Sequence, residues 1–528
     1  MREGKAPGFG RPFGRRSFLK GSAVAAAAVG AGSFSVGCAP KQGKGSSDEP
    51  QAQSVEEAVY PGICRGGCGG GCQMNVHVRE GKIVKTSRRE QSHADSTRLC
   101  NRGLTHALRV YDENRLKHPM KRVGERGEGK WEQISWDEAV TTITDKWKEV
   151  AEKHGPGANA FLKGSGNITP DAHHGLLLRS LMGATLLDPA QDRALYVAGP
   201  AAAGDSKYFC GSALEDVYNT KNLLIWGINP TESLSTIAHY ILRAQQEHGT
   251  KLIVIDPTFT ITASKADMFV PIHPGTDGAL AFGMMSVLVS ENLVDEAFLA
   301  SDTVAPLLVK DEDGTYLRLS DLGKAEAGTK EDLFAVAAPD GSFGSVAEIA
   351  APLIRGSFDV EGIAVTTSYD LLLERVAEWT PESASEVCDV PVETIKELAH
   401  IMVDGPSAVA PGLGLDHYTN GVATYASIFA MTMMAGQVGK PGTGFKGGFA
   451  SESSLGWMPN ALVNPPDAPK SDLFYSPALL NCMDSGKYGE SDINVKTLYI
   501  WNHNLFGTQV GGVKWREFLD KVELLVVA

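Results

Sequence analysis

The fold is decided by the stretch NLLIWGINP at residues 222–230 and by the stretch LIVIDP at residues 252–257. Each begins as a short apolar run and ends in turn residues, and a helical pattern around residues 236–246 lies between them. A buried strand, a helix and a second buried strand form a βαβ unit, in which the two strands are parallel. The sequence therefore predicts an α/β fold with doubly wound parallel sheets, whose ligands bind at the carboxyl ends of the strands.

The same alternation recurs elsewhere in the chain. An apolar run at residues 160–163 precedes a helical pattern through 176–181, and a strand at 497–501, a helix at 513–521 and a strand at 522–527 follow one another. At 528 residues the chain is too long for a single domain. Its formal net charge of −14 argues against nucleic acid as a partner, because phosphate binding needs a basic surface.

Four cysteines near the N-terminus predict a metal site. Cys64, Cys68 and Cys72 are spaced C-x3-C-x3-C, and Cys100 follows after a gap of 27 residues. Three close thiolates and one distant thiolate suit a cubane [4Fe–4S] cluster, with one cysteine bound to each iron. Glycines fill most of the space between the first three cysteines, and they permit the tight backbone turns that wrapping a cluster needs. Because four protein ligands leave no open iron, we expect this cluster to carry electrons rather than to bind substrate.

Other uses of these cysteines fit less well. Structural zinc sites usually contain paired C-x2-C knuckles, which are absent here. Disulfide frameworks are typical of small secreted domains, and this chain is far longer. A radical-SAM motif is spaced C-x3-C-x2-C and uses three cysteines, whereas a fourth is present here.

The N-terminal residues predict export. The run RRSFLK at residues 15–20 is a twin-arginine signal, and the apolar run at 23–29 that follows is too short to span a membrane. This export route carries folded proteins, which suits a cofactor inserted in the cytoplasm. We assign residues 1–43 to the signal and 44–58 to a linker, and we expect a periplasmic or extracytoplasmic location. Cys38 is a candidate lipid-acylation site, although the residue pattern before it is unusual.

Several runs around the fourth cysteine closely resemble one enzyme family. They are CNRG at 100–103, YDENRLKHPMKRVG at 111–124, GEGKW at 127–131 and ISWDEA at 134–139. The family is the dimethyl sulfoxide reductase family of molybdenum enzymes, and the resemblance is greatest to the catalytic chain of the anaerobic respiratory reductases. It implies one [4Fe–4S] cluster and a molybdenum, or tungsten, bis(molybdopterin guanine dinucleotide) cofactor.

The resemblance runs from about Cys64 to Ala528 and suggests how the chain is organised. We expect a [4Fe–4S] module at 59–120 and α/β domains that bind the first pterin dinucleotide at 121–405. Residues 406–528 would begin the second α/β pterin-binding part. Family members continue into further α/β sequence and a C-terminal β-barrel, so we expect this chain to be C-terminally truncated.

The resemblance also assigns residues to the cofactors. In the family a Lys or Arg two residues after the fourth cysteine lies between cluster and pterin; here it is Arg102, which could otherwise be an ordinary surface arginine. The resemblance places the remaining cofactor contacts in strand-end loops. The first pterin half has two such loops and one carboxylate, and the second half has two loops. These residues are Gly227 and Asn229; Asp256; Gly275, Thr276 and Asp277; Gly414 and His417; and Asn502 and Asn504.

The molybdenum ligand is where the sequence departs from close relatives, which use a serine. The matching segment at residues 188–195 has no serine or cysteine, and alignment on its alanine places Asp192 at the ligand position. The alternative is that Asp192 is a simple loop carboxylate; the metal would then have Asp188 as its ligand or no ligand from the protein. His173 and His174 lie nearby and are candidates to protonate a leaving oxygen, although structural or solvated roles suit them better.

These features together predict the catalytic chain of an exported anaerobic reductase. Electrons from an iron–sulfur partner would reduce the metal, which removes oxygen from a small S-oxide, N-oxide, oxyanion or phenolic substrate. A membrane anchor chain is a candidate for a second partner. A non-redox hydratase or transhydroxylase of the same family is one alternative, since the metal can also act as a Lewis acid. An inactive truncated fragment that retains the cluster module is the other.

Overall fold

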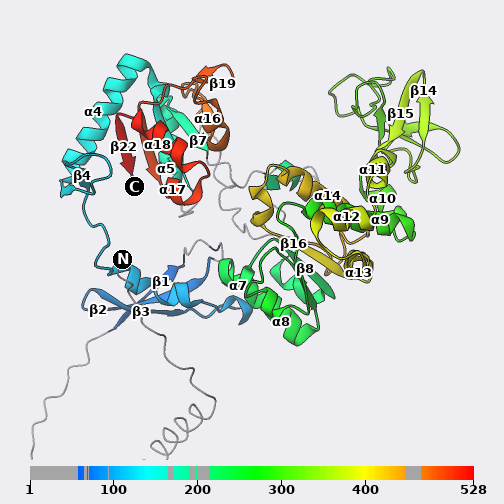
Figure 1. Cartoon of the computed structure of the whole chain (residues 1–528), viewed down its shortest axis with the longest axis horizontal. Coiled ribbons are helices and arrows are strands. Elements are labelled where there is room, and N and C mark those ends of the chain that lie inside the picture. The colour runs from blue at the N-terminus through cyan, green and yellow to red at the C-terminus, as the bar shows by residue number, and fades with distance from the viewer. Residues whose placement is uncertain are drawn as a thin grey trace, which may run out of the picture. The chain divides into compact units, whose positions relative to one another are not determined.

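The computed structural model of the chain describes residues 57–64, 68, 71–92, 94–164, 171–188, 194–195, 197–199, 213–446 and 465–528 (Figure 1). All of them belong to one unit, Glu57–Ala528. The predicted signal, Cys38 and most of the linker lie outside the described residues and stay predictions. In the part that is described, no helix has the length and apolar character that crossing a lipid bilayer requires.

The N-terminal part is a small antiparallel sheet followed by two short helices. The strands, in the order β1-β2-β3, are β1 Ala58–Ile63, β2 Gln73–Arg79 and β3 Lys82–Arg88, and the helices are α2 Asn101–Leu104 and α3 His106–Val110. Glu80 and Gly81 join β2 to β3 with positive φ angles of 49° and 74°. Alternating side chains on both sides of this turn are typical of a hairpin, and β2 and β3 pair antiparallel. A second hairpin follows, made by β4 Met120–Arg122 and β5 Trp131–Gln133.

The first large sheet is parallel, with the order β10-β9-β8-β16-β17. Its strands are β8 Asn222–Trp226, β9 Lys251–Ile255, β10 Met268–Val270, β16 Ser407–Pro411 and β17 Gly444–Phe445. Helices α7 Pro230–Ser233, α8 Ser235–His248, α9 Asp277–Ser290, α12 Pro381–Cys388, α13 Val392–Val403 and α14 Gly421–Met434 surround it. Successive strand residues point to opposite faces, so Leu223 and Ile225 pack with α8 while Leu224 and Trp226 pack with α9 and α14.

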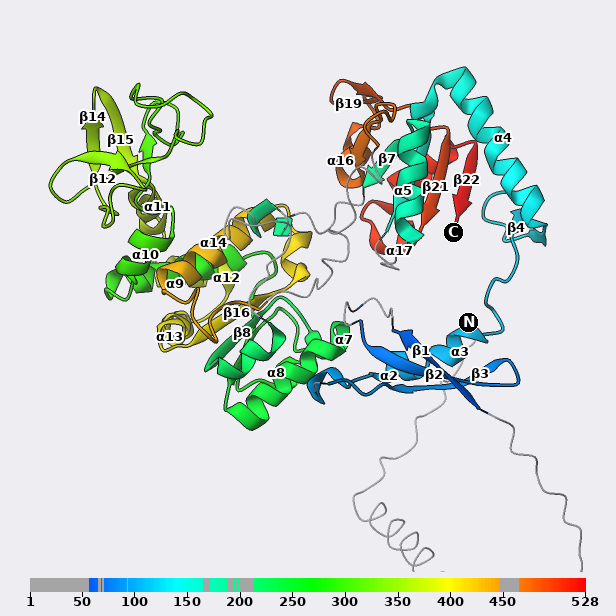
Figure 2. The same ribbon diagram turned by 180° about the vertical axis from the view of Figure 1, so that it is seen from behind.

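The second large sheet is also parallel, with the order β18-β7-β6-β21-β22. Its strands are β6 Asn159–Lys163, β7 Thr185–Asp188, β18 Leu473–Tyr475, β21 Thr497–Trp501 and β22 Leu524–Val527. Its helices are α4 Trp136–His154, α5 Asp171–Met182, α16 Ser476–Cys482, α17 Leu505–Thr508 and α18 Gly512–Asp520. Figure 1 and Figure 2 show the sheet from its two sides, with α18 in front in the first view and α5 in the second.

Each large sheet combines distant parts of the chain. In the first, β16 pairs with β8 in the register Ser407↔Asn222, and in the second, β21 pairs with β6 in the register Thr497↔Asn159. Strands from either side of residue 405 therefore share both sheets. The parallel, doubly wound architecture confirms the predicted fold class.

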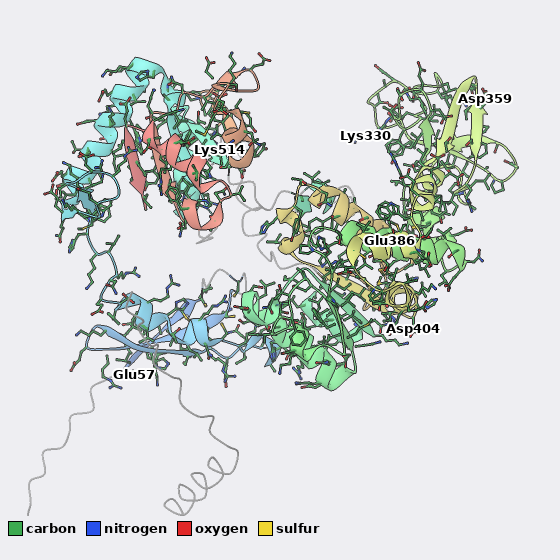
Figure 3. The ribbon with its side chains drawn as sticks, in the orientation of Figure 1. Glu57, Lys330, Asp359, Glu386, Asp404 and Lys514 are labelled. Atoms are coloured by element: carbon green, nitrogen blue, oxygen red, sulfur yellow. The ribbon has the colours of Figure 1, made fainter. Side chains whose placement is uncertain are left out.

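A small antiparallel β module interrupts the first α/β region. It contains β11 Leu308–Lys310, β12 Ala335–Ala337, β13 Phe343–Ser345, β14 Ser357–Val360 and β15 Ile363–Thr367, between α10 Glu296–Asp302 and α11 Ser368–Ala377. Lys330 and Asp359, labelled in Figure 3, are exposed on this module, whereas Asp332 is buried and accepts a hydrogen bond from the Ser320 amide. Leu308, Leu317 and Val365 form the module's own small core. The predicted site residues all lie outside this module.

Candidate functional site

The predicted cluster cysteines lie where secondary structure stops. Cys64 follows β1, Cys68 and Cys72 precede β2, and Cys100 is the N-cap of α2. Cys64, Cys68 and Cys72 are each at most 6% exposed, and the Cys64 amide donates a hydrogen bond of 2.8 Å to the carbonyl of Cys72. That bond closes the loop that carries the first three thiols.

These residues fit a four-iron cluster. Burial raises the pKa of the Cys72 thiol; the charge of Arg98 lowers it, and the charges of Cys64 and Cys68 raise it to a smaller degree. A Cβ at Gly103 would collide with the Leu99 side chain, so a glycine lets α2 approach the cysteine loop closely. Within the described residues, no group of three or more His, Cys, Asp or Glu side chains is arranged to hold one metal ion. The fit to a cluster therefore rests on the burial of the Cys64, Cys68 and Cys72 thiols, and the ligand assignment stays a prediction.

Sequence reasoning missed a histidine beside the cysteines. The Nε2 atom of His106 in α3 lies 3.1 Å from the Sγ atom of Cys64. Burial, followed by the charge of Arg109, lowers the pKa of His106. A neutral imidazole can donate a hydrogen bond to a thiolate. Its position six residues after Cys100 carries no recognisable signal in the sequence.

Arg102 links the cysteine module to a helix of the first large sheet. It is exposed, and its guanidinium donates a hydrogen bond to the carbonyl of Glu232 in α7. Helix α7 begins directly after Asn229, one of the predicted dinucleotide-binding residues. The Asn229 side chain donates to the Glu232 carboxylate at 2.8 Å and accepts from the Thr262 hydroxyl at 2.6 Å, so this loop is held rigidly.

Most of the predicted dinucleotide residues meet at the carboxyl edge of the first sheet. Gly227 follows β8 with a φ of +64°, and a Cβ on Gly414 would lie only 2.6 Å from the Gly227 carbonyl oxygen. The Gly275 carbonyl accepts a hydrogen bond of 2.9 Å from Asn420, which follows the 413–417 segment. The structure thus brings Gly275, Thr276 and Asp277 together with Gly414 and His417, as expected for ligand-binding loops at a strand edge.

Two buried carboxylates lie at this edge. Asp256 directly follows β9 and accepts a hydrogen bond of 2.8 Å from the Thr258 amide, and burial raises its pKa. Asp277 is 4% exposed and accepts a hydrogen bond of 2.8 Å from the Trp226 indole. Burial, and to a smaller degree the charge of Asp256, raises the pKa of Asp277. Few nearby groups compensate the charge of these buried carboxylates, so they are well placed to accept hydrogen bonds from a ligand.

Asn502 and Asn504 lie apart from this group, at the carboxyl edge of the second sheet. Asn502 follows β21 with a φ of +55°, and Asn504 is the N-cap of α17, where its side chain accepts from the Gly507 amide at 3.0 Å. Lys163 is the last residue of the neighbouring strand β6. Burial lowers the pKa of its ammonium group, and the charge of Asp188 offsets part of this effect by raising the pKa. Sequence reasoning missed Lys163, although its place at a strand end, directly before a glycine-rich loop, is a usable signal.

The predicted metal ligand, Asp192, lies outside the described residues, as do the side chains of His173 and His174. Residues 194 and 195, close after Asp192 in the chain, are described. There the Leu195 amide donates a hydrogen bond of 2.9 Å to the carboxylate of Asp416, which also accepts from the Tyr425 hydroxyl at 3.0 Å. This anchors the end of the predicted metal loop to the edge of the first sheet.

Comparisons with known proteins agree with this architecture. Residues 57–112 match the family description "Molybdopterin oxidoreductase Fe4S4 domain", and residues 115–527 match "Molybdopterin oxidoreductase". The chain is similar to a putative dimethyl sulfoxide reductase catalytic chain of Halobacterium salinarum, with 29% identity covering 97% of this chain and 63% of that protein. It is also 29% identical to the alpha chain of dimethylsulfide dehydrogenase from Rhodovulum sulfidophilum, over 71% of this chain and 43% of the relative.

A solved structure shows the same fold. Acetylene hydratase from Pelobacter acetylenicus superimposes with a TM-score of 0.57 at 17% identity, covering 88% of this chain and 60% of that one. The chain spans between 43% and 63% of the length of the Rhodovulum and Halobacterium relatives. Family descriptions match nearly all of the chain from residue 57 onward, and they confirm the resemblance seen around Cys100. The chain belongs to the molybdopterin oxidoreductase family and includes that family's Fe4S4 domain.

Proposed function

We propose that this chain is part of the catalytic component of a molybdenum reductase that removes oxygen from a small S-oxide, N-oxide, oxyanion or phenolic substrate. The observation that carries the proposal is the hydrogen bond from Arg102 to Glu232. It brings the cysteine module against the helix that starts at the Gly227–Asn229 loop. A guanidinium therefore stands between the cluster site and the strand edge where a dinucleotide would bind.

The residues suit two cofactors, a [4Fe–4S] cluster on the four cysteines and a molybdenum, or tungsten, bis(molybdopterin guanine dinucleotide). When bound, the second cofactor supplies the two-electron oxygen-transfer chemistry. The chain supplies position and electrostatics. Asp256 and Asp277 are placed to accept hydrogen bonds from guanine amino or ribose hydroxyl groups, which supports the dinucleotide assignment. Asn502 and Asn504 offer amide donors and acceptors for the second dinucleotide, and Asp192 stays our candidate metal ligand.

Electrons for the reaction need a source outside this chain. We infer two partners, an iron–sulfur electron-transfer protein and a membrane anchor protein. Two relatives are named as the alpha components of a dimethylsulfide dehydrogenase and of a perchlorate reductase, which supports an enzyme of several chains. The RRSFLK run at residues 15–20 supports twin-arginine export, and Cys38 would add a lipid anchor if it is acylated.

The metal and nucleotide content of the protein tests this proposal. The chain is purified without oxygen, and iron, molybdenum, tungsten and acid-released guanine nucleotide are measured per chain. We expect about four irons, one molybdenum or tungsten and two guanine nucleotides. Iron without molybdenum, tungsten or guanine nucleotide would overturn the oxygen-transfer role. A protein with full cofactor content that turns over without any electron donor would instead be a hydratase or transhydroxylase.

A further inference from the structure

His106 lies beside a predicted cluster ligand, and the proposed function gives it no role. Its Nε2 atom is 3.1 Å from the Sγ atom of Cys64, which is close enough for a hydrogen bond. Cys64 is buried, at 5% exposed, and His106 is half-buried. The two residues are 42 positions apart in the chain, so the fold of the module brings them together.

The segment that carries His106 is attached to β3 at two points. The Gly103 carbonyl accepts a hydrogen bond of 2.7 Å from the buried Thr86 hydroxyl. The Tyr111 hydroxyl, just after α3, accepts one of 2.7 Å from the Ile83 amide. His106 lies between these two attachments in the chain, so its position beside the cysteine is set by the packing of the module and not by its own side chain alone.

The backbone of α2 approaches the same sulfur atom. A Cβ on Gly103 would lie 3.5 Å from the Sγ atom of Cys64. A glycine of α2 and the imidazole of α3 therefore both lie against one predicted ligand. Hydrogen bonds to the ligand sulfurs and exclusion of solvent from them are two of the factors that set the reduction potential of an iron–sulfur cluster.

Iron binding would decide which atom of this pair carries the hydrogen. Cys64 would bind as a thiolate, which has no hydrogen of its own and can only accept. The hydrogen must then be on Nε2 of His106, and both the neutral imidazole with that tautomer and the imidazolium supply it. In the loaded protein the contact becomes a hydrogen bond that His106 donates to a cluster ligand.

We propose that His106 is a positioning residue that donates a hydrogen bond to the Cys64 thiolate and so raises the reduction potential of the iron–sulfur cluster. The proposal rests on the cluster that the proposed function assigns to the four cysteines. On reduction the cluster takes up one electron from the iron–sulfur partner protein, and no bond forms or breaks. The reduced cluster is the more negative state, so a hydrogen bond to a ligand sulfur stabilises it more than the oxidised state.

His106 and Arg102 then have different roles. Arg102 is exposed, and its guanidinium donates to the carbonyl of Glu232 in α7. The hydrogen bond of His106 is made to a predicted ligand sulfur instead. The tuning that we infer therefore belongs to His106 and is separate from the cation that the family places between cluster and pterin.

A redox titration of the full chain, purified without oxygen, tests the proposal. The reduced cluster is followed by electron paramagnetic resonance during titration with dithionite, and iron is measured on the same samples. We expect His106→Phe, which keeps a planar ring without a donor, to lower the midpoint potential. The ratio of reduced to oxidised cluster at a fixed potential should fall roughly tenfold, equivalent to ~59 mV for one electron. His106→Gln keeps an N–H donor and should restore most of the potential.

Pulsed electron paramagnetic resonance on protein labelled with nitrogen-15 histidine detects the contact itself. A hydrogen-bonded imidazole should give a weak nitrogen coupling in the wild type, and His106→Phe should lose it. Survival of the coupling in His106→Phe would contradict the contact. A strong coupling, of the size that a nitrogen bound directly to iron gives, would make His106 an iron ligand and overturn the proposal.

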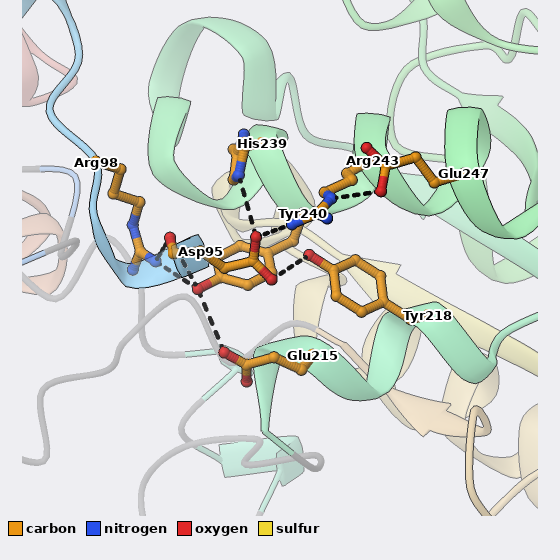
Figure 4. Close-up of polar contacts among 8 residues, drawn as sticks. All are labelled: Asp95, Arg98, Glu215, Tyr218, His239, Tyr240, Arg243 and Glu247. Atoms are coloured by element: carbon orange, nitrogen blue, oxygen red, sulfur yellow. Dashed lines mark hydrogen bonds and ion pairs between the residues drawn. The ribbon is translucent and has the colours of Figure 1, made fainter. Parts of the chain in front are cut away.

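Two control variants separate this hydrogen bond from general effects on the module. His118→Phe makes the same substitution at an exposed histidine of the module. Tyr218→Phe removes one hydrogen bond, of 3.1 Å, from the polar cluster at Asp95, in which this carboxylate also pairs with Arg243 (Figure 4). Neither control changes the formal charge at pH 7 or removes a group that contacts Cys64, so both potentials should equal that of the wild type.

The remaining outcomes are decisive as well. An unchanged potential in an iron-replete His106→Phe protein would overturn the proposal, as would an equal shift in either control or in His106→Gln. Loss of iron from both His106 variants, with iron retained in the controls, would assign His106 to cluster retention and also overturn the tuning role. Absence of iron from the wild-type protein would instead contradict the cluster itself, and with it the proposed function.

Discussion

The substitution Asp95→Asn should loosen the cysteine module from the first large sheet. The Asp95 carboxylate accepts from both Arg243 and Tyr218. An amide has one acceptor oxygen, so one of these donors would face an N–H group. A hydrogen bond to a charged group is worth about 1.5–3 kcal/mol. Because Arg243 is 35% exposed and can turn to water or to Glu247, we expect a loss of about 2 kcal/mol.

Hydrogen exchange measures this loss directly. Local opening governs exchange of the amides of Thr97 and Arg98, which donate to Ala94 and Ser96 at 3.0 Å each. A loss of about 2 kcal/mol corresponds to roughly 30-fold faster exchange of the peptide that contains them. Exchange within about threefold of the wild type, equivalent to less than ~0.7 kcal/mol, would refute the reasoning.

A control variant and the pH dependence distinguish loss of this ion pair from a general destabilisation of the fold. Glu247→Gln removes an exposed partner of Arg243 and should change exchange by about twofold at most. Burial alone would raise the pKa of Asp95, but the Tyr218 hydrogen bond and the Arg243 charge hold it below its usual value. A lowered carboxyl pKa gives stability that is full above the unfolded value and is lost as pH falls through the folded value. The difference between wild type and Asp95→Asn should therefore shrink below about pH 4.

Three further substitutions test the site. Cys72→Ser should abolish the iron content, while Cys388→Ser, which alters a buried cysteine at the end of α12, should leave iron per chain unchanged. Gly227→Ala should destabilise the chain to urea by about 1–2 kcal/mol and lower its guanine nucleotide content, because its φ of +64° is left-handed and a Cβ would lie 2.9 Å from Leu415. Asp277→Asn should stabilise the cofactor-free chain to urea at pH 7, since burial raises the carboxyl pKa, and the advantage should vanish as pH falls below that raised pKa; an advantage that persists in acid would contradict the electrostatic cause.

Local sequence patterns predict individual elements well. The apolar run at 222–226 is β8 to the residue, and the run at 497–501 is β21. Ser135 caps α4, its side chain accepting from the Glu138 amide, and the residues SWDE at 135–138 are typical of such a cap. These features depend on neighbouring residues only, through side-chain periodicity and capping. They are therefore readable from the sequence.

Pairing between distant strands is not readable in the same way. Nothing in the residues at 407–411 indicates that this strand joins β8, or that β21 joins β6. Such choices depend on how helices cover each face of a sheet, which is decided by packing across the whole domain. This is why Gly414 and His417 lie with Gly227 in the structure, while Asn502 and Asn504 belong to the other sheet.

The polar cluster at Asp95 escapes prediction for a related reason. In the sequence, residues 91–97 read as a polar surface loop. Asp95 is buried by Tyr218 and Tyr240, which lie more than a hundred residues away in the sequence. Because the carboxylate is buried, it requires a cationic partner, which is Arg243. A buried charge is recognisable only when its cover and its partner are both known.

The two arginines that flank Cys100 show how a short motif can position an entire module. Cys100 has an extended backbone, with φ −77° and ψ 174°, and α2 begins at the next residue. On either side of this change from extended chain to helix, Arg98 donates a hydrogen bond to Tyr240 in α8 and Arg102 donates one to the Glu232 carbonyl in α7. Both helices follow β8 in the chain, so each arginine holds the cysteines to a helix of the same βαβ unit. Substituting one arginine should therefore leave the other attachment in place.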